Sequence, residues 1–123
     1  MPTNPDPVTL SQVARRAAEV VDPADDDPDV ADLLTQFEDA DEPINGLLES
    51  LEERVAEAVG RVDPDGGLPA VQMMGSIIVY LGFRRDEVSD DEAHILRLAA
   101  RAEYDGDPPP VIEEWLADQG VSL

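Results

Sequence analysis

Proline and glycine divide this sequence into segments of helix length, and this punctuation constrains the fold more than any other feature. The strongest breaks lie at residues 22–23, 63–67 and 105–110. Between the breaks, apolar residues recur at every third or fourth position, as on one face of a helix, and no segment alternates convincingly with period two. The predicted helices span residues 9–21, 28–40, 44–62, 68–82, 89–104 and 110–118. The sequence therefore predicts an all-α protein, a compact bundle of five to six helices.

The length of 123 residues favours a single domain. We expect one helical domain over residues 9–123, preceded by a flexible, proline-rich lead over residues 1–8. The break at 63–67 is the one place where this domain could divide. No internal repeat stands out.

Three helix starts carry N-terminal capping signals. Thr9 with Gln12, and Ser89 with Glu92, have the spacing of a capping box, in which two side chains satisfy free backbone groups of the first turn. Asp27 precedes a proline and can cap the second helix. These signals predict helices that begin close to residues 9, 28 and 89.

The charge of the chain is strongly one-sided. All eight basic residues are arginine, and they stand against 29 Asp and Glu, for a formal net charge of −21. Such like charge destabilises a compact chain in dilute buffer, whereas multimolar salt reduces the Debye length to about 3 Å or less and screens the repulsion. The composition resembles that of cytoplasmic proteins from salt-accumulating halophiles, above all haloarchaea. This resemblance implies a cytoplasmic protein surrounded by diffusely bound cations.

Residue types exclude several kinds of chemistry. The chain has no cysteine, which rules out disulfides, zinc–thiolate sites and thiol catalysis. The absence of lysine rules out the phosphate-binding loop and Schiff-base chemistry. The single histidine, His94, lies off the apolar face of its helix at Ile95 and Leu98, so we expect it at the surface. We therefore predict no catalytic residues, no cofactor and no enzymatic activity.

One acidic stretch has the beginning of a calcium-binding pattern. Asp25, Asp27 and Asp29 occupy the first alternate positions of an EF-hand loop, but Val30 and Gln36 replace its required glycine and glutamate. We therefore predict no defined metal site.

The segment from residue 66 to residue 83 is uncharged, and Arg84 and Arg85 follow it. A membrane span needs about 20 predominantly apolar residues, and this segment contains Pro69 and several glycines, so we expect a buried helix rather than a span. Two arrangements would cover its apolar circumference. It either forms the interface of a homodimer or lies at the centre of a bundle of its own helices.

These features favour a protein that acts by contact with other proteins, as an adaptor or regulatory module that self-associates. Trp115 is a second candidate contact, because tryptophan is enriched in interface hot spots, although it could equally cap the core. The interaction candidates are Met73, Met74, Ile77, Ile78, Tyr80, Leu81, Phe83, Arg84, Arg85 and Trp115. The alternative is a nucleic-acid-related regulator, either binding DNA through a cluster of Arg84, Arg85, Arg97 and Arg101 or imitating DNA with its acidic surface.

Overall fold

The computed structural model describes residues 9–40, 49–84 and 91–121, which form an all-helical bundle. Within these ranges no β-strand forms, so the predicted all-α fold is confirmed. The six helices are α1 (Leu10–Val21), α2 (Pro28–Thr35), α3 (Leu51–Val62), α4 (Pro69–Phe83), α5 (Glu92–Tyr104) and α6 (Pro110–Asp118).

Local signals determine most of the helix starts. The Thr9 side chain accepts from the Gln12 backbone amide while the Gln12 side chain accepts from the Thr9 amide, so the predicted capping box is present. Asp27 caps α2 with its carboxylate. At α5 the cap is Asp91, whose carboxylate accepts from the His94 amide at 3.3 Å, and the helix begins at Glu92 rather than at residue 89.

Two predicted helices are shorter than the sequence pattern suggested. The α-helical part of α2 ends at Thr35, and tighter i→i+3 bonds continue the chain through Phe37, which is almost completely buried, to Ala40. The Phe37 side chain thus keeps the apolar periodicity beyond the end of the regular helix. α3 begins at Leu51. Residues 44–48 and Ser89, where we predicted helix starts, lie outside the described residues.

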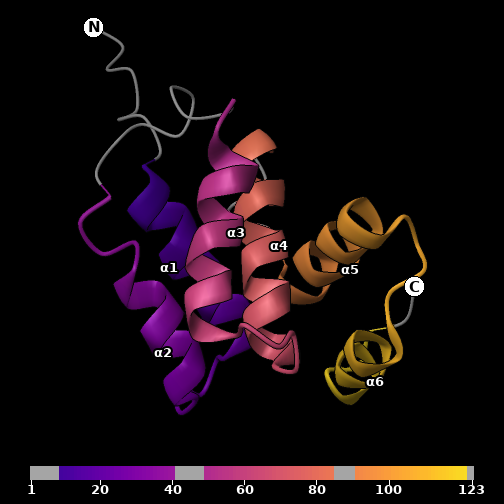
Figure 1. The fold of residues 1–123 in the computed structure, drawn as a ribbon. Helices are drawn as coiled ribbons and strands as arrows, with labels where there is room; N and C mark the ends of the chain where they lie inside the picture. Colours follow the sequence, from indigo (N-terminus) through magenta and orange to yellow (C-terminus); the bar gives the residue numbers. More distant parts are fainter. Residues whose placement is uncertain (1–8, 41–48, 85–90, 122–123) are drawn as a thin grey trace, which may run out of the picture.

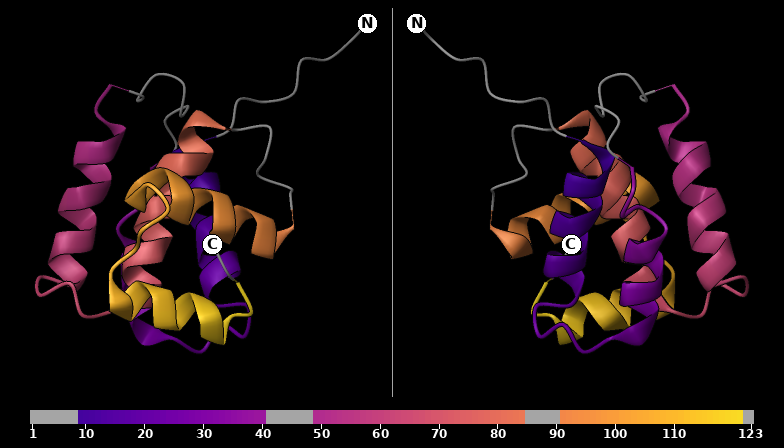
Figure 2. Two further views of the ribbon diagram at one scale, coloured as in Figure 1. Left: turned by 90° about the vertical axis from the view of Figure 1, so that its right-hand side faces the viewer. Right: turned by 90° about the vertical axis from the view of Figure 1, so that its left-hand side faces the viewer.

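α4 is the centre of the bundle. It contacts each of the other five helices, and in Figure 1 it lies behind α3, with α1 on one side and α5 on the other. Figure 2 shows α5 and α6 lying across the bundle while α3 stands at its side. Ten of the fifteen α4 residues are buried, and together with apolar side chains from all the other helices they form one hydrophobic core. The predicted burial of this uncharged segment follows from contacts within a single chain.

The first four helices form two equivalent hairpins, which we call the first hairpin (α1 and α2) and the second hairpin (α3 and α4). Val21-Asp22-Pro23 after α1 recurs as Val62-Asp63-Pro64 after α3, and a proline opens the next helix in both. Each hairpin starts with a 12-residue helix whose first residue is a buried leucine. The structure thus reveals an internal repeat that our sequence analysis missed.

The connecting turns of the two hairpins share one hydrogen-bond pattern. In the second turn the Asp63 carboxylate accepts from the amides of Gly67 at 2.9 Å and Leu68 at 3.0 Å. In the first turn Asp22 accepts in the same way from the residues that occupy equivalent positions, Asp26 at 3.3 Å and Asp27 at 3.0 Å. Asp25 and Gly66, also equivalent, both have left-handed backbone angles, with φ of 54° and 71°. Aspartates at equivalent positions, Asp22 and Asp63, therefore stabilise the turns of the two hairpins in the same way.

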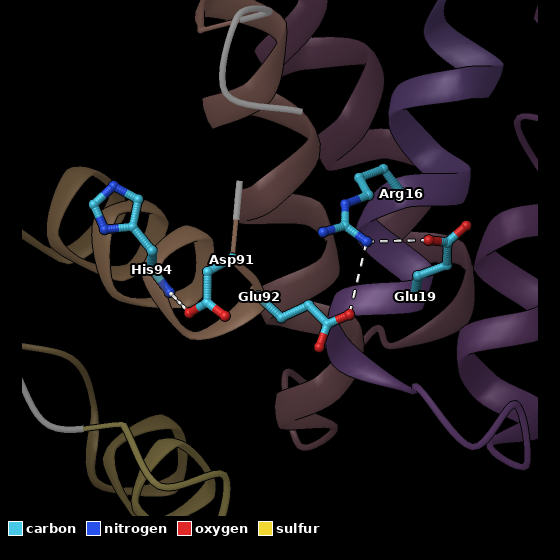
Figure 3. Close-up of polar contacts among 5 residues, drawn as sticks. All are labelled: Arg16, Glu19, Asp91, Glu92 and His94. Carbon is cyan, nitrogen blue, oxygen red and sulfur yellow. Dashed lines mark hydrogen bonds and ion pairs between the residues drawn. The ribbon is translucent and has the colours of Figure 1, made fainter. Parts of the chain in front are cut away.

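A polar contact joins the first hairpin to α5. The Arg16 guanidinium lies 3.1 Å from the Glu19 carboxylate and 3.7 Å from that of Glu92, the first residue of α5 (Figure 3). Arg16 is mostly buried, whereas both carboxylates are more than half exposed. Exposed ion pairs of this kind contribute about 0–1 kcal/mol, so the contact orients α5 more than it stabilises it.

Candidate functional site

A large hollow lies within the second hairpin and is lined on one side by the end of α5. Its volume is about 760 Å³, within the usual range of binding pockets. We call it the α3–α4–α5 groove. Its helical lining comprises Glu52, Val55, Ala56, Val59 and Gly60 from α3, Gln72, Gly75, Ser76 and Val79 from α4, and Ala102, Glu103 and Tyr104 from α5.

The first hairpin carries an equivalent hollow that is only about half as large, at about 400 Å³. Ten of its eleven lining residues occupy positions equivalent to lining residues of the α3–α4–α5 groove. The larger hollow is also lined by α5, and two side-chain differences accompany the difference in size. Glu19 and Leu34 in the first hairpin correspond to Gly60 and Gly75 in the second. The second hairpin thus lacks two side chains that the first hairpin carries at equivalent positions.

These two glycines have different structural roles. A Cβ atom on Gly75 would lie 2.7 Å from Cγ2 of Val59, so glycine is needed here for α3 to approach α4 closely. A Cβ atom on Gly60 would meet nothing within 4 Å. Glycine inside a helix costs about 1 kcal/mol relative to alanine. Because no packing contact explains Gly60, its effect is to keep the groove open.

We predict opposite stability changes when each glycine is replaced by alanine. Gly60→Ala should raise the free energy of unfolding by up to about 1 kcal/mol through helix propensity. Gly75→Ala should lower it by about 1–2 kcal/mol, because crowding against Val59 outweighs the same propensity gain. Urea denaturation of both variants at constant high salt measures the two changes. Changes of the same sign would contradict the distinction.

Both glutamates of the groove come from helices, Glu52 from α3 and Glu103 from α5. The pKa of Glu103 is raised above its ordinary value, first by partial desolvation of the carboxyl and second by the negative charge of Glu52. The charge of Glu52 thus disfavours ionisation of Glu103, and a cationic group near Glu103 would offset that effect.

Tyr104 and Ser76 add hydroxyl groups to the groove. Burial raises the pKa of the Tyr104 phenol, a hydrogen bond with Ser76 lowers it in part, and the Glu103 charge raises it further. The Ser76 hydroxyl is itself buried and donates to the Gln72 carbonyl at 3.1 Å. The phenol therefore stays protonated at neutral pH, and its hydroxyl is engaged with Ser76.

Asp63 anchors one end of the groove. Burial alone would raise the pKa of its carboxyl, but hydrogen bonds from the Gln72 side chain and from the amides of Leu68, Gly67 and Gly66 together lower it below its ordinary value of 3.8. The bond from Gln72 Nε2 is 2.8 Å long. With its oxygens engaged in this way, Asp63 acts as a structural anchor between α3 and α4.

The structure separates the interaction candidates into two groups. Five of them, Met73, Met74, Ile77, Ile78 and Leu81, are completely buried among the helices of their own chain. In this fold these five side chains offer no surface to a partner.

The remaining candidates lie nearer the surface. Tyr80, Phe83 and Arg84 line a hollow of about 350 Å³ that shares Glu52 and Glu103 with the α3–α4–α5 groove and continues it past the end of α4. Trp115 on α6 is half-buried and packs against the core. Arg85 lies outside the described residues. The structure thus brings three candidates together at a groove that the sequence did not reveal.

The other sequence hypotheses concern His94, the arginines and metal ions. His94 is exposed, and Figure 3 shows its ring pointing away from the Arg16–Glu92 pair. Arg84 and Arg101 are exposed and Arg97 is half-buried, on or next to two different helices. Within the described ranges, no group of three or more His, Asp or Glu side chains is arranged to hold a metal ion.

The fold and the groove define a class of protein, an α-helical bundle of two repeated hairpins with a surface groove in the second. No protein-family model matches the chain, and no curated protein or solved structure matches it. Over the described part of the chain, none of the helices combines the length and apolar character needed to cross a membrane.

Proposed function

We propose that this protein is a non-enzymatic interaction module, an adaptor or regulatory subunit that receives a helix of another polypeptide in the α3–α4–α5 groove. The observation that carries this proposal is Gly60. This residue weakens its helix, a Cβ atom on it would meet nothing within 4 Å, and it lines a groove about twice the volume of the equivalent hollow in the first hairpin.

The dimensions and lining of the groove suit a helix. From Gln72 to Phe83 its floor follows α4 for about 16 Å, equal to about three helical turns. Small residues at Ala56, Gly75 and Ala102 bring backbone close to the surface, which permits close helix approach. Docking of an apolar helix face into such a groove is a recurrent mode of peptide recognition.

The surroundings of the groove bear on the alternative function. Glu52, Asp65 and Glu103 line it, so its charge repels nucleic-acid phosphates. We therefore favour a polypeptide partner over a nucleic acid. The acidic composition further supports a protein of a salt-rich cytoplasm.

Photo-crosslinking tests the proposal directly. A benzophenone amino acid replaces Ala56, an exposed residue that lines the groove, and in a matched control replaces its repeat equivalent Arg15, which is exposed beside the smaller hollow. Irradiation in a halophilic host at native salt should yield adducts with another polypeptide chain from position 56 and none from position 15.

A second variant distinguishes binding in the groove from binding nearby. Gly60→Leu extends a side chain into the groove from a position with no neighbour within 4 Å, so the helix should remain intact. Combined with the crosslinker at position 56, it should reduce the adduct yield by about tenfold or more, equivalent to about 1.4 kcal/mol of binding free energy. Adducts that survive Gly60→Leu, or that form equally at both positions, would refute the groove as the binding site.

A further inference from the structure

One end of the α3–α4–α5 groove carries an exposed aromatic side chain. Phe83, the last residue of α4, is 50% exposed and is the most exposed large hydrophobic residue in the described ranges. It lines the hollow that continues the groove, together with Tyr80. Exposed aromatic residues next to a hollow are typical of contact sites, because their burial on binding releases a large apolar area.

Arg84 follows Phe83 directly and is exposed. It forms no ion pair with any residue that the structure describes. The same hollow is lined by Glu52 and Glu103, which lie close enough for the charge of Glu52 to raise the pKa of Glu103. This face therefore presents the apolar side chain of Phe83 and the positive charge of Arg84. Beside them lies the groove with the negative charges of Glu52 and Glu103.

A face that carries both an apolar projection with a positive charge and a hollow with negative charges offers the two kinds of element that a self-complementary contact needs. In a two-fold symmetric interface each surface element meets its counterpart on the other copy. We propose that a second copy of this chain docks here, with Phe83 of each copy entering the other's groove and Arg84 of each copy lying between the other's Glu52 and Glu103. The inference rests on the proposed function, because it names the polypeptide that occupies the groove.

The high net negative charge of the chain affects whether two copies can associate. Two chains of net charge −21 repel each other as wholes, so an interface between them needs local opposite charges and screening of the rest. Arg84 provides the local positive charge at the acidic groove. Multimolar salt, with a Debye length of about 3 Å or less, screens distant charges while leaving close, partly buried pairs less affected.

Sedimentation velocity with the full-length protein in about 2 M KCl tests the proposal. The wild-type chain, at tens of micromolar, should sediment as a species of twice the 13.3 kDa chain mass. Phe83→Ser and Arg84→Glu should each weaken dimerisation by about tenfold or more and yield monomer. Val111→Ser is the matched control, because Val111 is also an exposed hydrophobic residue but lies on α6 away from the groove, and it should leave the dimer unchanged.

A charge exchange tests the pairing itself. Glu103→Arg should also yield monomer, and the double variant Arg84→Glu with Glu103→Arg should recover dimer, while circular dichroism confirms that each variant is folded. A monomeric wild type, a dimer that resists both Phe83→Ser and Arg84→Glu, or a double variant that remains monomeric would overturn the proposal. A monomeric wild type that still crosslinks a different polypeptide from position 56 would overturn the second copy alone. Monomer without adducts would overturn the groove function as well.

Discussion

Replacing Asp63 by alanine should lower the free energy of unfolding by about 2–4 kcal/mol at neutral pH. The substitution removes a buried carboxylate that accepts hydrogen bonds from the amides of Gly67 and Leu68 and from the Gln72 side chain. It leaves these three donors without their acceptor at the junction of α3 and α4. Urea denaturation followed by circular dichroism at constant high salt measures the loss.

The repeat provides a matched control for this substitution. Asp22→Ala removes the equivalent carboxylate of the first turn, but Asp22 is half-buried and its two bonds to backbone amides are 3.0–3.3 Å long. Water can replace these bonds, so we expect a loss of only about 1 kcal/mol. Equal losses for the two variants would show that the Gln72 bond and the deeper burial of Asp63 add nothing.

The contribution of Asp63 should also depend on pH. Its folded-state pKa is lower than the ordinary value of 3.8, so the unfolded chain binds the proton first as the pH falls. The stabilisation is therefore complete above pH 3.8 and disappears as the pH falls through the lower folded-state pKa. The difference in unfolding free energy between wild type and Asp63→Ala should shrink in that acidic range and stay constant above it.

Removing salt should have the second large effect. When KCl is reduced from about 3 M to about 0.1 M, the Debye length grows to about 10 Å and the repulsion within a chain of net charge −21 is no longer screened. We expect the cooperative thermal transition, followed by far-ultraviolet circular dichroism, to be lost at low salt. An unchanged transition in about 0.1 M KCl would contradict this expectation.

A charge-reduced variant separates screening from other effects of salt. Glu49, Glu53 and Glu57 are exposed, on or next to α3, and replacing all three by glutamine removes negative charge without touching the core. This variant should remain folded at a lower KCl concentration than the wild type. If KCl acted only through hydrophobic burial, the two proteins would unfold at the same concentration.

The sequence predicted the helices well because their signals are local. Apolar spacing marks the faces that enter the core, and Thr9 and Asp27 cap their helices as predicted. The uncharged stretch after residue 66 predicted a buried helix, which α4 confirms. Whether α4 is buried by a dimer partner or by helices of its own chain depends on contacts between distant segments. The spacing of residues along the chain does not contain that information.

The groove was not predictable for the same reason. Gly60 and Gly75 are isolated glycines within helical patterns, and only the packing of α3 on α4 shows that one permits contact while the other leaves space. The repeat was harder to see because equivalent positions differ in residue type. Asp25 and Gly66 share a left-handed conformation that both residue types tolerate. The two turns are therefore similar in backbone although the residues differ in type.

The central position of α4 also constrains how the chain folds during synthesis. Residues 69–83 emerge from the ribosome after α1, α2 and α3, yet α1 and α3 bury their apolar faces largely against α4. More than half of the chain is therefore synthesised before α4, and until α4 emerges it has no complete core. Its dense negative charge keeps such a nascent chain apart from its neighbours until the hydrophobic centre arrives.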